Sequence, residues 1–543
     1  MWERVRHLTG PHRVLVLSVV VGGLVGLAVA ALEQVVGRWI LGWTLDLPPW
    51  PRTLAPAVGL LLTWLILRFV GRGASPATAD EYLHSFHNLD GEVVPAVAPA
   101  KFLGVAASLG SGVALGFEGP AIYLGSLIGG LVGRGSRRLL RPEDRRTLLV
   151  AGSAAGVAAI FKTPATGAIF ALEVPYHDDI ASNAIGPSIL AAASGYVVFA
   201  LFFGFDRLFP ISGGSPLHAG QMAGAIVLGL AAGLGARGFA ALEMAAKWVN
   251  AHLPAWVRLL ASGGALVGLG ALTWVVYAAP LSMGTGELAI DWSQTAVRSL
   301  VLLALLAGIR ILATASSLAG GAVGGVFVPL VAEGWLLGAM FAVIVHDHSL
   351  LYEAIGAAAF LGAGYRVPIA GIVFVAESTG RPGFIVPALL ATAVAQLAMG
   401  NASVTHLQRR SRHDRIDHLM EEPIATALVR VARCAPGDPL AEVVTRGRFV
   451  AVVDAGRYVG LVDRGAALDV LVADPAARVS LPLPVSAAVG PVGAPNWSIG
   501  RTRDLFGASP DDVVEVVPVC DGPHILGVVT PASLLARTRP PED

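Results

Sequence analysis

Long apolar runs separated by short polar loops fill residues 12–405, and the charged residues gather after His406. One of these runs, Val14–Leu32, is long enough to cross a bilayer as a single helix. Many of the later runs are interrupted by Gly and Pro, which favours tilted and half-spanning helices. We therefore predict an all-α polytopic membrane domain over residues 1–405, with ten or more helices.

The composition agrees with this pattern and excludes several classes of protein. Hydrophobic residues make up 55% of the 543 residues and charged residues only 14%, whereas soluble domains carry about 25% charge. The 38 basic and 38 acidic residues cancel, which argues against a nucleic-acid partner because such proteins are basic. The histidines show no metal-ligand spacing, so we predict no metal site.

Basic segments indicate the orientation in the membrane. Residues 134–146 and 406–415 are rich in Arg, and three arginines precede the first apolar run. By the positive-inside rule these segments, the N-terminus and the tail should be cytoplasmic. A cleaved signal peptide is the competing interpretation of the first run. The many apolar runs that follow disfavour it.

The tail has a different pattern. After a basic linker over residues 406–420, residues 421–543 alternate short β-rich runs with turns. Residues 448–468 resemble residues 516–535: each segment has a strand, a turn containing Gly, a second strand and a helix start. We predict a paired soluble α/β module. Its two cysteines, Cys434 and Cys520, fit a reducing cytosolic location without a disulfide framework.

The membrane part contains an internal duplication. FKTPATGAIFALE (161–173) matches YRVPIAGIVFVAE (365–377) with an offset of 204, and GFEGPAIYLG (116–125) matches GVFVPLVAEG (325–334) with an offset of 209. Similar offsets for motifs in the same order predict two repeats, over roughly 14–210 and 217–405.

Paired helices broken by Gly and Pro are typical of transporters and channels. A helix that begins in mid-membrane presents free N–H groups and the positive end of its dipole, which favour an anion. Each motif has a Gly shortly before a Pro, as expected of a loop that opens a helix. The predicted ligand is a small anion held mainly by backbone.

Glu118 is the only charged residue between Phe102 and Gly133. A carboxylate in an apolar span is expensive and is functional by default. At a helix start it would occupy the place of a passing anion, and protonation would release it, so Glu118 could be both gate and proton carrier. Glu173 and Glu377 end apolar runs, and we interpret them as caps of helix ends near water.

These motifs resemble the CLC family of chloride channels and chloride/proton antiporters. The resemblance implies inverted repeats, a homodimer and a pair of CBS domains in the tail. It also implies that Glu118 is the gating glutamate. The implied anion-binding residues lie in the two motifs: Gly116, Phe117, Glu118 and Gly119 in the first, and Gly325, Val326 and Phe327 in the second.

The sequence departs from the CLC pattern at three places. Gly73 stands where the family has a serine ligand, with Ser75 two places away, and Val404 stands where it has a tyrosine. Glu173 matches the first of an adjacent glutamate pair, but Val174 replaces the second, proton-relaying one. The loss of the second glutamate slightly favours a channel-like chloride pathway, although Glu173 or a water path would be an alternative route for protons. The missing serine and tyrosine ligands bear on anion selectivity instead. Chloride/proton exchange and a fluoride-type or poorly selective carrier are the alternatives.

CBS pairs often bind an adenine nucleotide, for which Thr530 and Asp463 are the candidate residues by this resemblance. A tail that only stabilises the dimer is the alternative. A divalent cation channel with CBS regulation is the rival from another class, and it would need Glu118, Glu173 and Glu377 to converge on one ion. An intramembrane serine protease would need a Ser and a His on facing helices, and the sequence shows no such pair.

Overall fold

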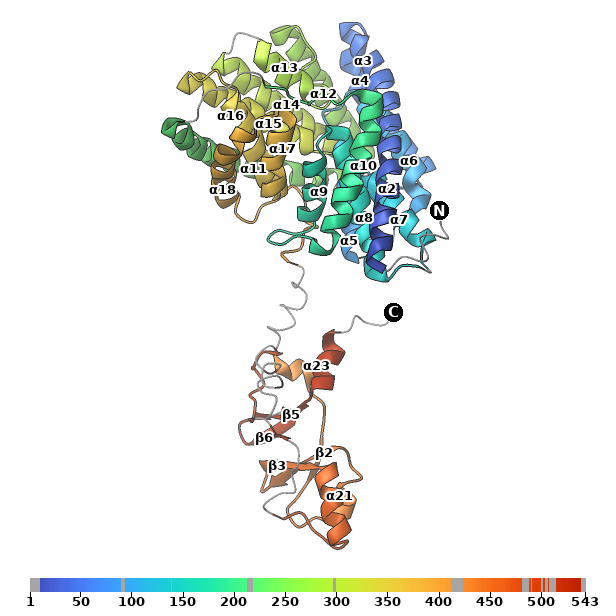
Figure 1. The fold of residues 1–543 in the computed structure, drawn as a ribbon, viewed down its shortest axis with the longest axis vertical. Coiled ribbons are helices and arrows are strands. Elements are labelled where there is room, and N and C mark those ends of the chain that lie inside the picture. The colour runs from blue at the N-terminus through green and yellow to red at the C-terminus, as the bar shows by residue number, and fades with distance from the viewer. Residues whose placement is uncertain are drawn as a thin grey trace. The chain divides into compact units, whose positions relative to one another are not determined.

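The computed structural model describes residues 10–88, 93–137, 139–211, 218–295, 299–411, 423–480, 488–489, 491–499, 502, 506 and 514–538. The chain divides into two compact units, one within residues 1–411 and the other within residues 412–543. Helices form the first unit, and short strands and helices form the second (Figure 1).

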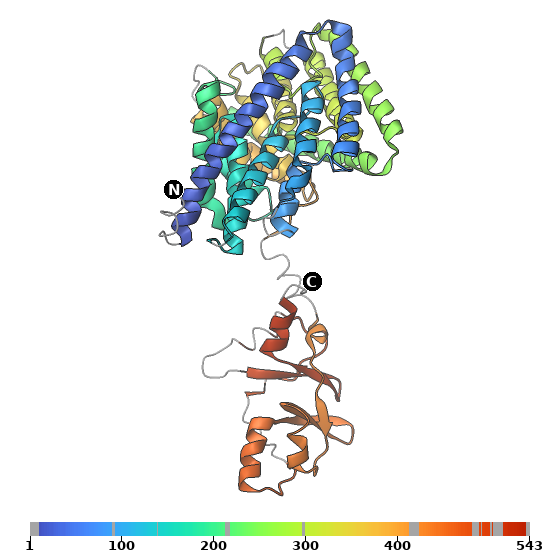
Figure 2. The same cartoon turned by 90° about the vertical axis from the view of Figure 1, so that its right-hand side faces the viewer.

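The first half of the helical unit is coloured blue to teal in Figure 1. Its helices are α2 (Gly10–Leu32), α3 (Gly42–Asp46), α4 (Pro49–Leu65), α5 (Ala79–Asn88), α6 (Ala98–Gly110), α7 (Glu118–Gly135), α8 (Pro142–Phe161), α9 (Pro164–Glu173) and α10 (Ile185–Phe203). A π-helical segment, η1 (Glu33–Leu41), joins α2 to α3, and Figure 2 shows them as one long tilted helix.

The second half repeats this succession of long and short helices. Its helices are α11 (Ala219–His252), α12 (Ala255–Tyr277), α13 (Glu287–Thr295), α14 (Leu300–Gly320), α15 (Phe327–Val345), α16 (Leu351–Tyr365), α17 (Pro368–Thr379) and α18 (Ile385–Met399).

Eight helical segments of the described chain are long and apolar enough to cross a membrane. In contrast, α9 has 10 residues and α17 has 12. At 1.5 Å per residue neither can span a hydrocarbon core of about 30 Å. They are the half-spanning helices that the Gly- and Pro-broken runs predict.

Reciprocal hydrogen bonds relate the two halves of the helical unit. The Ser108 hydroxyl on α6 accepts from the Val323 N–H at 2.9 Å, and the Ser317 hydroxyl on α14 accepts from the Ala114 N–H at 3.1 Å. Ser317 lies 209 positions after Ser108, as Val323 does after Ala114. Each contact is thus repeated with its partners exchanged, which is the pattern that a two-fold axis between the repeats produces. These exchanged contacts agree with the predicted duplication.

The ends of α9 and α17 make the same kind of exchange. The carboxylate that ends each helix accepts hydrogen bonds from the first turn of the other helix. These bonds join Glu173 to the N–H groups of Ile369 and Ala370, and Glu377 to the N–H groups of Ala165 and Thr166 and the Thr166 hydroxyl. Both acids are therefore caps, but the expectation that they cap their own helix ends near water is wrong.

Removal of one exchanged cap should destabilise the helical unit. In Glu377→Ala the first turn of α9 loses its carboxylate acceptor, which should cost about 1–3 kcal/mol. We expect a lower midpoint of thermal unfolding in detergent. Thr166→Val, which removes only the hydroxyl bond to the same carboxylate, is the matched control and should shift the midpoint less. Equal shifts for the two variants would contradict the assigned cap.

The second unit contains two three-stranded sheets of the same topology. In the first, β1 (Ala432–Cys434) pairs parallel to β2 (Phe449–Asp454), and β2 pairs antiparallel to β3 (Arg457–Asp463). In the second, β4 (Ala488–Val489) pairs parallel to β5 (Val514–Asp521), and β5 pairs antiparallel to β6 (His524–Val529).

A helix follows each hairpin: α21 (Arg464–Ala473) after β3, and α23 (Pro531–Thr538) after β6. The hairpin loops have positive φ at Ala455, Gly456 and Gly522, which two-residue turns between twisted strands require. The repeated hairpin-plus-helix unit is thus confirmed.

Candidate functional site

The two Gly–Pro motifs meet in the middle of the helical unit. Gly116 and Gly325 form an antiparallel bridge in which each N–H donates to the other carbonyl, at 2.8 and 2.9 Å. The bridge stands directly before α7, which begins at Glu118, and α15, which begins at Phe327. The positive ends of two helices therefore come together from the two repeats.

The Glu118 side chain lies at this junction. Its exposed fraction is 0%, and its Oε1 accepts a hydrogen bond from the Phe327 N–H at 2.6 Å. The Val328 N–H also acts on the carboxylate. Within the described residues its Oε2 has no hydrogen-bond partner. An acid from one repeat thus fills the anion position at the helix start of the other.

Glycines make the room for this carboxylate. A Cβ at Gly116 would overlap the Glu118 carboxyl group, and a Cβ at Gly325 would overlap the same group and come within 2.5 Å of the Gly119 nitrogen. At Gly119 a Cβ would overlap the Thr78 hydroxyl and lie 2.9 Å from the Gly325 Cα. At Gly119 and Gly325 the two backbones cross so closely that only glycine fits, whereas at Gly116 the obstacle is the Glu118 side chain.

Residues next to the Glu118 site line two separate cavities. The first, the Tyr365 cavity, has a volume of about 540 Å³, and its wall includes Gly325, Val326 and Tyr365. The second, the Phe117 cavity, has a volume of about 280 Å³, and its wall includes Phe117 and Val328. Glu118 follows Phe117 and binds the amide between Val326 and Val328, so its immediate neighbours belong to the walls of both cavities.

The Tyr365 cavity brings together candidates that are far apart in the sequence. Gly73, Ser75 and Val404 all line it. The Ser75 hydroxyl accepts from the Ala77 N–H at 3.1 Å, so it shapes the loop before α5. Val404, buried on this wall, offers no hydroxyl.

Sequence reasoning missed Tyr365, which also lines this cavity. Its hydroxyl meets the backbone amide of Val326. A tyrosine hydroxyl is therefore present at the cavity, but it comes from the end of α16 rather than from the position of Val404. The sequence feature that could have identified it is its position as the first residue of the repeated segment YRVPIAGIVFVAE.

The structure corrects two of the predicted anion ligands. The N–H groups of Gly116 and Gly325 are taken by the bridge between them, so neither is available to an anion. Their contribution is space for Glu118. The amides of Val326 and Phe327 remain at the site, one beside the Tyr365 hydroxyl and the other bound to Glu118.

Comparison with known proteins agrees with this geometry. The sequence pattern of the family described as "Voltage gated chloride channel" matches residues 58–400. The chain belongs to this family, the CLC family. It is accordingly an integral, multi-pass membrane protein that transports anions, since CLC members are transporters or channels rather than enzymes.

Relatives within the family carry both channel and exchanger names. A protein called putative chloride channel protein ClcB-like, from Ralstonia nicotianae, is 29% identical over 64% of this chain and 81% of its own length. The H(+)/Cl(-) exchange transporter ClcA of Klebsiella pneumoniae is 28% identical over 74% of this chain and 89% of its own. A solved slow cyanobacterial Cl-/H+ antiporter has the same fold, with a TM-score of 0.63, 22% identity and coverage of 71% and 94%.

Glu118, Glu173 and Glu377 of this CLC chain do not converge on one point. Glu118 binds the first turn of α15, whereas Glu173 and Glu377 bind the first turns of α17 and α9. Each carboxylate has its own backbone donors, and no group of three metal-ligating side chains occurs among the described residues. The divalent cation hypothesis required these three acids to converge.

Glu173 is held as a cap, and its neighbour Val174 is buried. A valine cannot carry a proton. Any proton that reaches Glu118 from the Tyr365 cavity therefore needs a carrier other than Val174.

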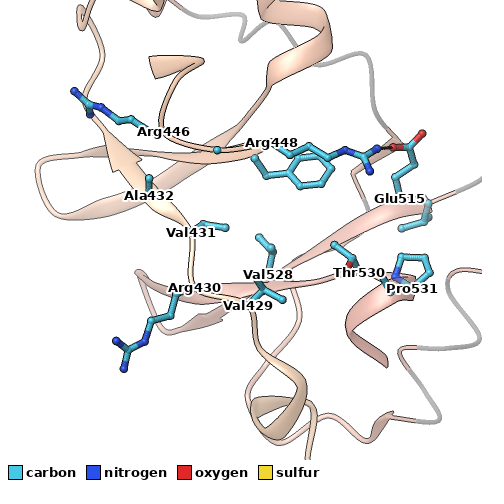
Figure 3. A pocket seen from close by; sticks show the side chains of 14 residues that line it. Val429, Arg430, Val431, Ala432, Arg446, Arg448, Glu515, Val528, Thr530 and Pro531 are labelled. Atoms are coloured by element: carbon cyan, nitrogen blue, oxygen red, sulfur yellow. Dashed lines mark hydrogen bonds and ion pairs between the residues drawn. The ribbon is translucent and has the colours of Figure 1, made fainter. Parts of the chain in front are cut away.

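The second unit of this CLC chain contains a pocket of about 600 Å³ between its two sheets. Figure 3 shows Arg448 and Glu515 joined by an ion pair beside it. Thr530 lines the pocket, and its hydroxyl accepts from the Ser533 N–H. Asp463 is not among the lining residues: its carboxylate accepts from the Gly465 N–H at the start of α21.

Proposed function

We propose that this protein exchanges chloride for protons across the membrane, with Glu118 as both gate and proton carrier. The observation that carries the proposal is the Glu118 carboxylate on the Phe327 amide, where two helix starts meet and where neighbouring residues line two separate cavities. A carboxylate there competes with an anion for the same donors. Protonation removes its charge and lets the anion take its place.

The proposed anion site consists of backbone amides, and among the described residues no Lys or Arg hydrogen-bonds to the Glu118 carboxylate that now fills it. The Phe327 and Val328 amides act on the carboxylate now and would act on chloride when the side chain leaves. On the side of the Tyr365 cavity, the Val326 amide donates to the Tyr365 hydroxyl, whose own proton supplies a further donor for the anion. Neutral donors of this kind bind an anion weakly enough to let it move on.

Exchange is now favoured over the channel that the sequence slightly favoured. The channel interpretation rested on Val174, which removes one proton-carrying position but leaves Glu118 in place. The names of the ClcA relative and of the cyanobacterial antiporter support exchange. The name of the Ralstonia relative keeps a passive chloride pathway as the second candidate.

Purified protein in liposomes tests the proposal. The vesicles are loaded with chloride, and a chloride electrode and a pH electrode record both ions after the gradient is imposed. Exchange predicts that chloride leaving the vesicles drives protons inward against their own gradient. Chloride efflux without proton movement would instead identify a channel. Vesicles loaded with fluoride show whether the carrier is of the fluoride type.

We further propose the assembly and orientation that the CLC resemblance implies. The protein forms a homodimer with one pathway in each subunit, and its N-terminus and tail face the cytoplasm. Exposed apolar side chains on α10 and α18, including Ile189, Leu201, Val386 and Leu389, suit a buried or lipid-covered face. The mass of the purified protein in detergent tests the dimer.

The repeated hairpin-plus-helix units suggest a CBS pair, and its pocket has a size that suits an adenine nucleotide. Arg446 and Arg448 on its wall would hold phosphate, because arginine donates in pairs to phosphate oxygens. Thr530 would contact the ribose or base. Asp463, which caps α21, would not take part.

We expect ATP to bind the full-length protein, and Arg446→Ala with Arg448→Ala to weaken binding by at least about tenfold. The loss of one charge-assisted hydrogen bond, about 1.5–3 kcal/mol, accounts for that factor. Equilibrium binding of labelled ATP measures the effect. Arg457→Ala, an exposed arginine outside the pocket, is the control. If ATP does not bind the unaltered protein, the tail acts only in stabilising the dimer.

A further inference from the structure

Glu243 is a buried acid that the proposed pathway has not used. It lies on α11 with an exposed fraction of 1%. Neither of its carboxylate oxygens has a hydrogen-bond partner in the part of the chain that is described. Burial of an unpaired carboxyl group is expensive, so such a residue in a membrane domain calls for a function.

The neighbours of Glu243 connect it to the wall of the Tyr365 cavity. Lys247 lies one turn further along α11, and its Nζ donates to Asp80 Oδ2 at 3.0 Å and to the Val404 carbonyl at 2.9 Å. Lys247 and Asp80 both line the cavity, whereas Glu243 does not. Glu243 is therefore one helical turn behind a wall that water can reach.

The Lys247–Asp80 ion pair is complete without Glu243. Its two opposite charges neutralise each other, and Lys247 makes its remaining contact with a carbonyl. Glu243 can therefore gain or lose a proton without leaving a hydrogen-bond partner unpaired. A group that serves only as a structural counter-ion would not have this freedom.

The Tyr365 cavity brings this part of α11 towards the gate, because Lys247 and Asp80 share its wall with Val326 and Tyr365. The charges that act on it are Lys247, Asp80 and Glu118. The charges of Glu118, Glu243 and Asp80 all act on the Tyr365 hydroxyl, and Tyr365 lines the same cavity as Asp80. On the other helices that pack against α11, Arg310 on α14 and Glu333 on α15 act on each other.

We propose that Glu243 is the proton-transfer residue between the Tyr365 cavity and Glu118, an inference that rests on the proposed exchange function. A carboxylate oxygen of Glu243 takes a proton from water in the cavity. The proton then passes to the Glu118 carboxylate through the Tyr365 hydroxyl or water beside it, and Glu243 returns to its ionised form. Glu243 thus does on α11 what Val174 cannot do at the end of α9.

Glu243→Gln in the liposome assay tests this role. Glutamine has nearly the same size and cannot ionise, so chloride efflux should continue while proton uptake falls by about a hundredfold or more, the effect of losing a positioned proton carrier. The chloride signal from the same vesicles reports that the protein is folded. Proton uptake should also depend less on the pH of the solution that reaches the Tyr365 cavity.

Glu333→Gln is the matched control, because Glu333 is equally buried but acts on Arg310 rather than on the gate. It should keep both ion movements coupled. Proton-coupled transport that persists in Glu243→Gln would overturn the inference. Loss of proton coupling in Glu173→Gln but not in Glu243→Gln would overturn it as well. A Glu243→Gln protein that carries neither ion would also overturn it, by giving Glu243 a structural role. If the unaltered protein moves no protons, it is the exchange function itself that fails.

Discussion

Replacement of Glu118 by Gln is expected to abolish proton transport and to leave chloride flowing down its gradient. The glutamine side chain keeps an oxygen that can accept from the Phe327 amide, but it carries no charge and no transferable proton. A neutral acceptor binds such a donor about 1 kcal/mol less well than a carboxylate. This shifts the balance between a side-chain-filled and an anion-filled site by about fivefold towards the anion. Chloride efflux should therefore rise and lose its dependence on pH.

The two electrodes of the liposome assay measure this outcome directly. Glu377→Gln is a useful comparison. It alters an acid that binds the first turn of α9, and Glu377 lines neither the Tyr365 cavity nor the Phe117 cavity. Proton uptake that persists in Glu118→Gln would show that Glu118 is not the proton carrier. Chloride efflux that keeps its original rate and pH response would show that it is not the gate.

Gly116→Ala should open the same gate by steric displacement. All three atoms nearest to a Cβ at Gly116 belong to the Glu118 carboxyl group. Gly116 is not among the glycines with positive φ, so the substitution tests space alone. Overpacking of this kind costs about 1–3 kcal/mol if nothing moves. The flexible side chain should move instead, raising chloride efflux and weakening proton coupling.

A double-mutant cycle separates this effect from general damage. In a Glu118→Ala background the atoms that the added methyl group would overlap are gone, so Gly116→Ala should change efflux little. Gly325→Ala provides the contrast, because its Cβ would also meet the backbone nitrogen of Gly119. Backbone cannot swing away, and we expect this variant to lose chloride transport. Equal effects of Gly116→Ala with and without Glu118 would contradict the steric explanation.

The sequence predicted those parts of the site that depend on local chemistry. Gly and Pro mark where helices begin, so the two motifs could be recognised as broken helix starts. Glu118 stood out because no other charge lies near it in the sequence. The hairpins of the tail followed from their alternating strands and Gly-containing turns.

Features that depend on pairing across the repeats could not be predicted in this way. Glu173 and Glu377 each end a helix, and only the inverted arrangement of α9 and α17 shows that they bind each other's first turn. Glu243 lies near Lys247 towards the end of a long helix, which is typical of a polar helix end at the membrane surface. Its burial follows from the helices packed around α11.

The absence of the family's tyrosine at Val404 was inferred from position, and it stays a prediction that does not describe the whole site. The chain supplies a hydroxyl from Tyr365 instead, more than one helix earlier in the sequence. Alignment of motifs compares residues at equal positions. It cannot detect a group that reaches the same place from another element.

The backbone bridge between Gly116 and Gly325 restricts how this machine can move. A mechanism in which the two halves rock apart, as in many carriers with inverted repeats, would break both interlocking hydrogen bonds in every cycle. Because these hydrogen bonds hold the two halves together, the movement that costs the least free energy is a rotation of the Glu118 side chain. We then expect the transport rate to depend on rotation of this side chain and on movement of ions between sites, while the surrounding helices keep their positions.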